Sequence, residues 1–219
     1  MTRPAALSLL LAPAALLAFA AMPSPANAAT MPHDHAATEA KATVPAPKLQ
    51  AALRQLWHGH VVQTRAYAMA VHAHRDADAK RAADGVVANA RQIADAVAGF
   101  YGPAAGQRML QLLAGHWGAV KALTDAHDAA ARQKAMSELT ANAGEIARFL
   151  AGANPYLPEN AVLGLLMAHG GHHAAQISQI MAGDMKAEAA TWETMQAHMD
   201  AIADALAGAI ARQFPAKAA

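Results

Sequence analysis

The stretch Leu56-Trp57-His58-Gly59-His60 recurs twice, as LLAGH at 112–116 and LLMAH at 165–169. Each copy reads Leu, three residues and then His, with a small residue just before the histidine. A second recurring segment follows each copy: IADAVAG at 93–99, IARFLAG at 146–152 and IADALAG at 202–208. Internal repeats of this length typically mark one supersecondary unit that has been copied. The pattern predicts three tandem helical hairpins, each with one histidine in the middle of its first helix.

The sequence from Leu49 onward has a helical character. It is rich in Ala and lacks β-branched runs, and Gly or Pro stands mostly at plausible joints such as Gly102-Pro103. We predict six helices, at 49–74, 77–99, 103–127, 129–152, 158–182 and 185–213. Because short connections make consecutive helices antiparallel, the expected fold is all-α: a six-helix up-and-down bundle built from three repeated helical hairpins.

The recurring histidines lie on apolar faces of their helices. His60 is spaced three or four residues from Leu53, Leu56 and the following apolar positions, and His116 and His169 sit in similar stripes. At about 1.5 Å per residue, the three would lie within about 3 Å of one height if the odd-numbered helices run parallel. His173 lies one turn from His169, and His198 in the last helix falls near the same level. We therefore predict a polar layer across the middle of the bundle.

Such a layer is typical of a metal site. Imidazoles from several helices suit zinc, copper, nickel or cobalt, and the predicted ligands are His60, His116, His169, His173 and His198. A histidine ligand usually needs an acceptor for its other ring nitrogen, a role we assign to Asn89, Asn142 and Glu145. Thr64 and Arg65 are predicted to contact a small ligand beside His60. His-Glu-x-x-His and Glu-x-x-His motifs are absent from the sequence, which argues against ferritin-like chemistry.

Other interpretations remain open at this point. A His/Glu layer could perform acid–base catalysis, although no catalytic motif is visible and no catalytic residue can be named. Haem held non-covalently by histidine is a weaker candidate, because only ten aromatic residues are present to wall a porphyrin. A hydrogen-bonded polar core without any ligand would give the same pattern. We favour the binding of a metal ion or small molecule without catalysis.

The N-terminal region predicts export. Arg3, an apolar run and Ala26-Asn27-Ala28 fit a signal peptide at 1–28 with cleavage after Ala28. Residues 29–48 read as a disordered tail that contains His33 and His35, and 49–215 as the helical domain. The expected location is periplasmic or secreted, without stable membrane insertion after cleavage. The oligomeric state is not predicted.

Charge and cysteine content exclude several classes of protein. The formal net charge is +1, and it becomes zero when Arg3 is removed, so no basic surface for nucleic acid is expected. The chain has no cysteine, which excludes disulfides, a lipoprotein anchor and covalent haem attachment.

Four further patterns together carry a family resemblance. They are LWxxHVxxTRxY at 56–67, YGxxAG at 101–106, NAxEI at 142–146 and QFP at 213–215. In these patterns the chain resembles an uncharacterised bacterial family of small all-helical proteins over nearly all of residues 53–215. The resemblance implies the domain boundaries and the His/Asn/Glu set, and the family has no established activity to transfer.

Overall fold

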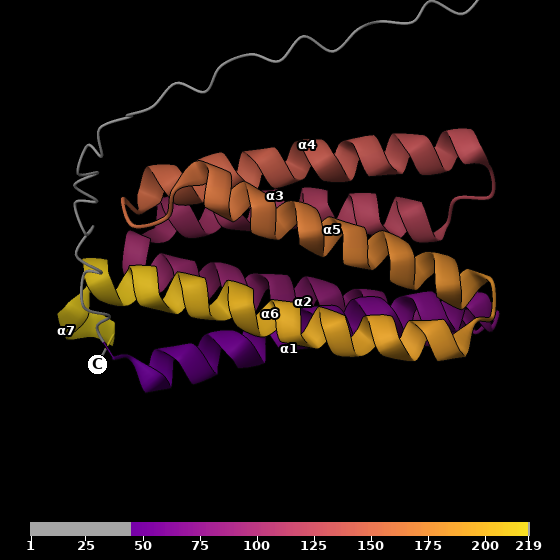
Figure 1. Ribbon diagram of the computed structural model, residues 1–219, viewed down its shortest axis with the longest axis horizontal. Helices are drawn as coiled ribbons and strands as arrows, with labels where there is room; N and C mark the ends of the chain where they lie inside the picture. Colours follow the sequence, from indigo (N-terminus) through magenta and orange to yellow (C-terminus); the bar gives the residue numbers. More distant parts are fainter. Residues whose placement is uncertain (1–44, 219) are drawn as a thin grey trace, which may run out of the picture. The chain divides into compact units, whose positions relative to one another are not determined.

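The computed structural model describes residues 45–218, and all regular structure in this range is helical. The all-α prediction is therefore confirmed. The predicted signal peptide and most of the tail, including His33 and His35, lie outside the described residues. Seven helices pack against one another: α1 (Pro47–His72), α2 (Asp76–Tyr101), α3 (Pro103–Thr124), α4 (Ala129–Ala153), α5 (Glu159–Met181), α6 (Met185–Gln213) and α7 (Pro215–Ala218) (Figure 1).

Local sequence signals set the helix ends. Pro47 and Pro103 each stand in the first turn of a helix, where their missing N–H costs no hydrogen bond. Gly102 joins α2 to α3 at a φ of 91°, a conformation that favours glycine. Asp128 and Asp184 cap α4 and α6 by accepting hydrogen bonds from the backbone N–H groups three residues later. The predicted ranges differ from these helices by three residues or fewer at every end.

The short α7 was not predicted. The sequence places the end of the domain at 215, but the chain turns into another helical segment after Gln213 and Ala218 is buried. Lys217 ties this segment to α2 by donating a hydrogen bond to the carbonyl of Gly99 at 2.7 Å.

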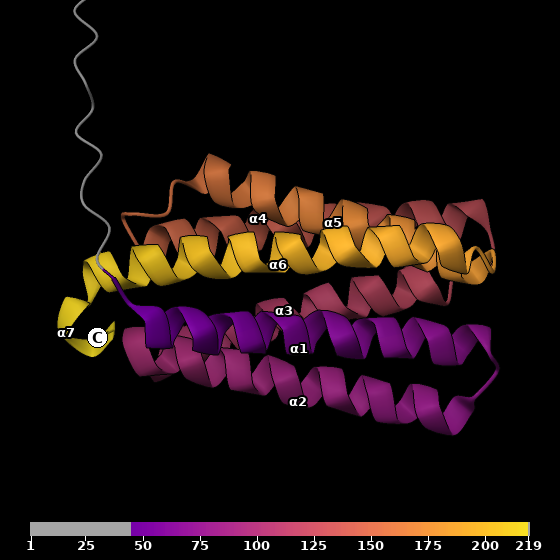
Figure 2. The ribbon, with the colours of Figure 1, turned by 60° about the horizontal axis from the view of Figure 1, so that its bottom comes forward.

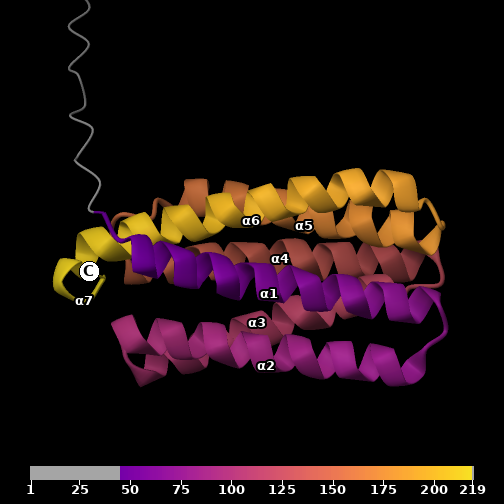
Figure 3. The ribbon, with the colours of Figure 1, turned by 90° about the horizontal axis from the view of Figure 1, so that it is seen from below.

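Each long helix packs against its neighbours in the chain, and α6 returns to pack against α1 (Figures 2 and 3). The chain reverses at each connection, so α1, α3 and α5 run in the same direction (Figure 1). These three helices also contact one another. A side chain that points inward from each of them can therefore reach a common centre. The origin of the hairpins by repetition stays a prediction.

The apolar core is divided into two clusters along the helices. One lies toward the N-terminal ends of the odd-numbered helices and includes Leu53, Met109 and Val162. The other includes Leu123 and Ile180, nearer their C-terminal ends. The predicted polar layer falls between the two clusters. No helix in the described range is long and apolar enough to cross a membrane.

Candidate metal centre

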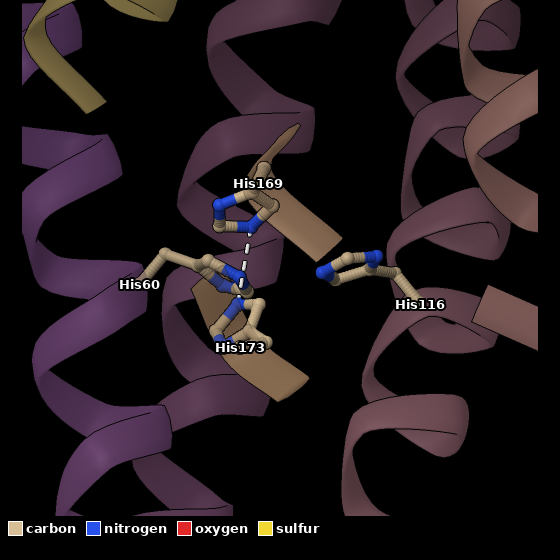
Figure 4. A group of neighbouring side chains, drawn as sticks. All are labelled: His60, His116, His169 and His173. Atoms are coloured by element: carbon tan, nitrogen blue, oxygen red, sulfur yellow. Dashed lines mark hydrogen bonds between the residues drawn. The ribbon is translucent and has the colours of Figure 1, made fainter. Parts of the chain in front are cut away.

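Four histidines meet where α1, α3 and α5 converge. α1 contributes His60, α3 contributes His116, and α5 contributes His169 and His173 (Figure 4). All four are buried, with 1–5% of their surface exposed. One ring nitrogen from each lies within 4.8 Å of the chosen nitrogens of the other three. Residues from three separate helices thus present their nitrogens to one small volume.

Helical periodicity explains this arrangement. Residues four apart lie on the same helix face, so His169 and His173 project side by side from α5, and their Nε2 atoms are 3.1 Å apart. His60 and His116 complete the group from the parallel helices α1 and α3. The ring centroids are 4.4 to 5.9 Å apart across the four residues.

The cluster is electrically neutral at physiological pH. Burial, together with the nearby His116, lowers the pKa of His60 to about 3. Burial also lowers the pKa of His116 to about 4, partly offset by the Asn142 side chain. The pKa values of His169 and His173 are well below the ordinary value, because of burial and the neighbouring histidines. Neutral imidazole is the form that binds a metal ion.

Several ring nitrogens in the cluster have no hydrogen-bond partner among the described residues. The unpartnered atoms are both nitrogens of His60, Nε2 of His116 and Nδ1 of His169. A buried polar atom without a partner costs about 1–3 kcal/mol. A ligand that engages these nitrogens would remove this cost.

Three side chains on the even-numbered helices make equivalent contacts. The amide of Asn89 donates to the carbonyl of Leu56, that of Asn142 donates to Leu112, and Nε2 of His198 lies 2.8 Å from the carbonyl of Leu165. Each acceptor stands four residues before a clustered histidine. These contacts fix the register of each helix pair at the height of the cluster.

Small residues make these contacts possible. A Cβ added at Gly59 would lie 2.9 Å from Nδ2 of Asn89, and one at Gly115 would lie 3.0 Å from Nδ2 of Asn142. In the third hairpin the corresponding residue is Ala168, and the partner there is His198.

Not every predicted site residue joins the cluster. His198 is only partly buried, and its ring stacks against His169 with centroids 6.5 Å apart. Its Nε2 contacts the carbonyl of Leu165, and His198 stands outside the group of four whose ring nitrogens converge. Asn89 and Asn142 lie beside the cluster but donate to backbone carbonyls, and their Oδ1 atoms have no partner among the described residues.

Glu145 lies on the surface rather than among the four clustered histidines. Its side chain is 49% exposed and pairs with Arg108 at 3.3 Å, so it does not support a histidine ring. Thr64 is buried one turn after His60, but its hydroxyl bonds to the carbonyls of His60 and Val61 in its own helix.

Arg65 belongs to a separate polar cluster that the sequence analysis missed. Its guanidinium donates to both carboxylate oxygens of Glu188, at 2.6 and 2.8 Å, and lies over the ring of Trp192. Gln176 donates to the same carboxylate at 2.9 Å. These contacts lower the pKa of Glu188, with Arg65 as the main cause. Glu188 is fully buried.

Comparison with known proteins gives no match: no family model, no curated protein and no solved structure matches this chain. The chemistry of the cluster must therefore carry any functional conclusion.

Proposed function

We propose that this protein binds one transition-metal ion of the zinc, copper, nickel or cobalt group through His60, His116, His169 and His173. The observation that carries the proposal is the convergence of four buried, neutral imidazoles within 4.8 Å, several with unpartnered nitrogens. In this proposal the form that binds the metal is the chain without the predicted signal peptide, residues 1–28.

The donor set selects the class of ion. Imidazole nitrogen suits zinc, copper, nickel and cobalt, whereas magnesium and calcium prefer carboxylate and carbonyl oxygen. The described metal-binding group contains only histidines. Four neutral ligands do not compensate the positive charge of the ion, so burying it in an apolar core costs free energy. Strong covalent bonds to nitrogen are needed to offset this cost.

The geometry requires only a small adjustment. Tetrahedral bonds of 2.0–2.1 Å to nitrogen separate the ligand atoms by about 3.4 Å. The Nε2 atoms of His169 and His173 are already 3.1 Å apart, and the widest pair in the cluster has to close by about 1.4 Å at most. Rotation of the rings of His60 and His116 supplies a movement of this size.

The same geometry weighs against the alternatives. The apolar cavity that His60, His116 and His169 line leaves only about 30 Å³ for the centres of water-sized molecules, far too little for a porphyrin or a metabolite. The depressed pKa values of His60 and His116 make both rings poor acids and bases at neutral pH. A purely structural layer would pair its nitrogens, and among residues 45–218 His60 pairs neither.

We further propose that the protein acts in the periplasm or outside the cell, and that its six long helices are three copies of one hairpin. Residues 1–28 with Arg3 and Ala26-Asn27-Ala28 support export, and the recurring phrases support the repeats. N-terminal sequencing of the protein from its host tests the first point. A mature chain that starts at Ala29 is expected, and an intact Met1 would contradict export.

A metal titration tests the main proposal. The metal-free protein is titrated separately with Co(II), Cu(II), Ni(II) and Zn(II), and bound metal is measured by mass spectrometry, with the visible spectrum of Co(II) as a report on geometry. One ion per chain is expected. His116→Leu should weaken binding at least tenfold, whereas His127→Leu, at an exposed histidine, should not. Equal loss in both variants, or no binding by the unmodified chain, would overturn the proposal.

A further inference from the structure

An apolar cavity lies directly against the histidine cluster. His60, His116 and His169 line it, and the rest of its wall is apolar, including Trp57, Leu150 and Val162. His173 is not part of the wall. The cavity leaves about 30 Å³ for the centres of water-sized molecules.

The cavity occupies one side of the cluster. Trp57, Leu113 and Val162 precede the clustered histidines on three helices that run in the same direction, so the cavity lies toward the N-terminal ends of these helices. His173 follows His169 by one turn and lies on the other side of the layer. An ion held by the four nitrogens would thus face the cavity through the triangle of His60, His116 and His169.

The size and lining of the cavity restrict its occupant. A single water needs about 10–15 Å³ of such space, so the cavity has room for a molecule of about two heavy atoms. Apart from the three histidine rings, the wall offers a guest only apolar contacts. A charged guest would lose its hydration without compensation from the apolar wall, so only the charge of the ion itself would attract an anion. The wall therefore favours a small uncharged molecule over an anion.

We propose that this cavity admits an uncharged diatomic gas, of the class of dioxygen, nitric oxide and carbon monoxide, to the ion held by the histidine cluster. The inference rests on the proposed metal site. The gas binds as a fifth ligand on the face opposite His173, where the triangle of His60, His116 and His169 faces the cavity. Only binding is proposed, without electron transfer.

A second apolar cavity extends the space away from the cluster. It leaves about 40 Å³ and shares Trp57, Leu150, Leu157 and Leu206 with the first. Its wall continues to Phe100 and Tyr101 at the end of α2. The shared wall residues separate the two spaces, and their side-chain motion would connect them. Motion of these shared side chains would give an apolar molecule a path along the core.

Ala205 offers a way to fill the first cavity. It lines the cavity from α6 but is itself exposed, so a larger side chain is tolerated there. Ala205→Leu is the test variant. Ala201→Leu, one turn earlier on α6 and also exposed, lies outside the wall and is the matched control. Val162→Leu, from α5, is a second filling variant. Circular dichroism confirms that each variant is folded.

Two probes are used on the full chain. The first is xenon on the metal-free protein, followed by xenon NMR. The second is carbon monoxide on the Cu(I)-loaded protein, followed by the infrared band of bound carbon monoxide, with azide on the Cu(II)-loaded protein as the charged comparison. We expect the unmodified chain and Ala201→Leu to bind xenon and carbon monoxide but not azide. Ala205→Leu and Val162→Leu should bind both gases at least tenfold more weakly.

The outcomes separate this inference from the proposed metal site. Copper binding without any bound carbon monoxide, or filling variants that bind both gases like the control, overturns the inference and leaves the metal site standing. Azide binding as tight as that of carbon monoxide also overturns it. If copper does not bind, the metal site itself fails, and the role of the cavity as an approach to an ion fails with it.

Discussion

Two groups of buried polar side chains lie on neighbouring turns of α1 and α5, and they are satisfied in opposite ways. Around Glu188, the carboxylate accepts two hydrogen bonds from Arg65 and one from Gln176. In the histidine cluster, the only hydrogen bond between the four rings joins His169 to His173. Neither nitrogen of His60 has a hydrogen-bond partner in the part of the chain that the structure describes.

The difference separates a structural polar group from a binding site. The Glu188 cluster is complete within the chain, so it fixes the packing of α1, α5 and α6 without any ligand. The histidine cluster keeps a cost in free energy that the chain alone does not remove. Sites that bind a ligand commonly retain such a cost, because the ligand supplies the missing partners.

Lowering the pH should cause the largest loss of stability in the metal-free protein, and the buried histidines should be its cause. Each has an unfolded pKa near 6.5, whereas the folded pKa is about 3 for His60 and about 4 for His116. Below pH 6.5 the unfolded chain therefore binds more protons, and stability falls as pH falls. Each histidine contributes about 1.4 kcal/mol per pH unit, continuing down toward its folded pKa. Urea unfolding of the metal-free protein between pH 7.5 and 5 measures this loss.

The double variant His60→Leu/His116→Leu is the control for the acid effect. It should lose stability with a clearly smaller slope, since two of the histidines with depressed pKa values are gone. A metal-free protein that is equally stable at pH 7 and pH 5 would contradict the burial of neutral histidines.

The second-largest loss of stability should come from breaking the Glu188 cluster. Glu188→Gln leaves Arg65 without a carboxylate and should lower the free energy of unfolding by about 2–3 kcal/mol, less than for a fully buried pair because the Arg65 side chain is 32% exposed. Glu145→Gln removes the exposed partner of Arg108 and should cost less than about 1 kcal/mol. Equal losses in the two variants, measured by urea unfolding, would contradict a structural role for the Glu188 cluster.

Replacing a clustered histidine should instead raise the free energy of unfolding of the metal-free protein. His60→Leu keeps a similar volume and removes two unpartnered nitrogens, so the metal-free protein should become more stable by about 1–2 kcal/mol. The same variant should bind metal at least tenfold more weakly. Thermal unfolding with and without metal measures both effects. A marked loss of stability in the metal-free variant would favour a structural polar layer instead.

The smallest effect should come from the glycines beside the cluster. Gly59→Ala brings a Cβ within 2.9 Å of Nδ2 of Asn89 and should lower stability by about 1 kcal/mol, because the bond of Asn89 to Leu56 is displaced. Gly118→Ala meets nothing within 4 Å and should raise stability by up to about 1 kcal/mol through helix propensity. If thermal unfolding shows the two variants equally stabilised, the Asn89 contact does not set the register.

Helical periodicity made much of the fold and most of the cluster predictable. His60, His116 and His169 could be placed on inward faces because each lies three or four residues from buried apolar positions. The spacing of His173 from His169 fixed it on the same face. Gly102-Pro103 and the Asp caps marked helix ends by local chemistry alone.

The remaining features depend on neighbours that periodicity does not identify. Glu145 lies next to the buried Ile146, and one residue is enough to turn it outward. His198 has the right height, but the carbonyl of Leu165 engages its ring. Glu188 reads as an ordinary acidic residue in a first helical turn. Its spacing of seven from Met195, and of eleven from Met199, was the signal for a buried position.

The cavity beside the histidines could not be predicted at all, because it is the difference between the volume of the core and the volume of its side chains. The same holds for the unpartnered nitrogens, which depend on the orientation of each ring. Sequence patterns place residues on a face, and packing decides whether their polar atoms find partners.

X-ray absorption spectroscopy of the metal-loaded protein tests the central claim most directly. The account predicts four nitrogen ligands at about 2.0–2.1 Å, with the outer-shell scattering of imidazole rings. His116→Leu should lose one of these ligands, and the exposed-histidine variant His127→Leu should lose none. A first shell dominated by oxygen, or one that is the same in His116→Leu as in the unmodified protein, would contradict a metal site built from His60, His116, His169 and His173.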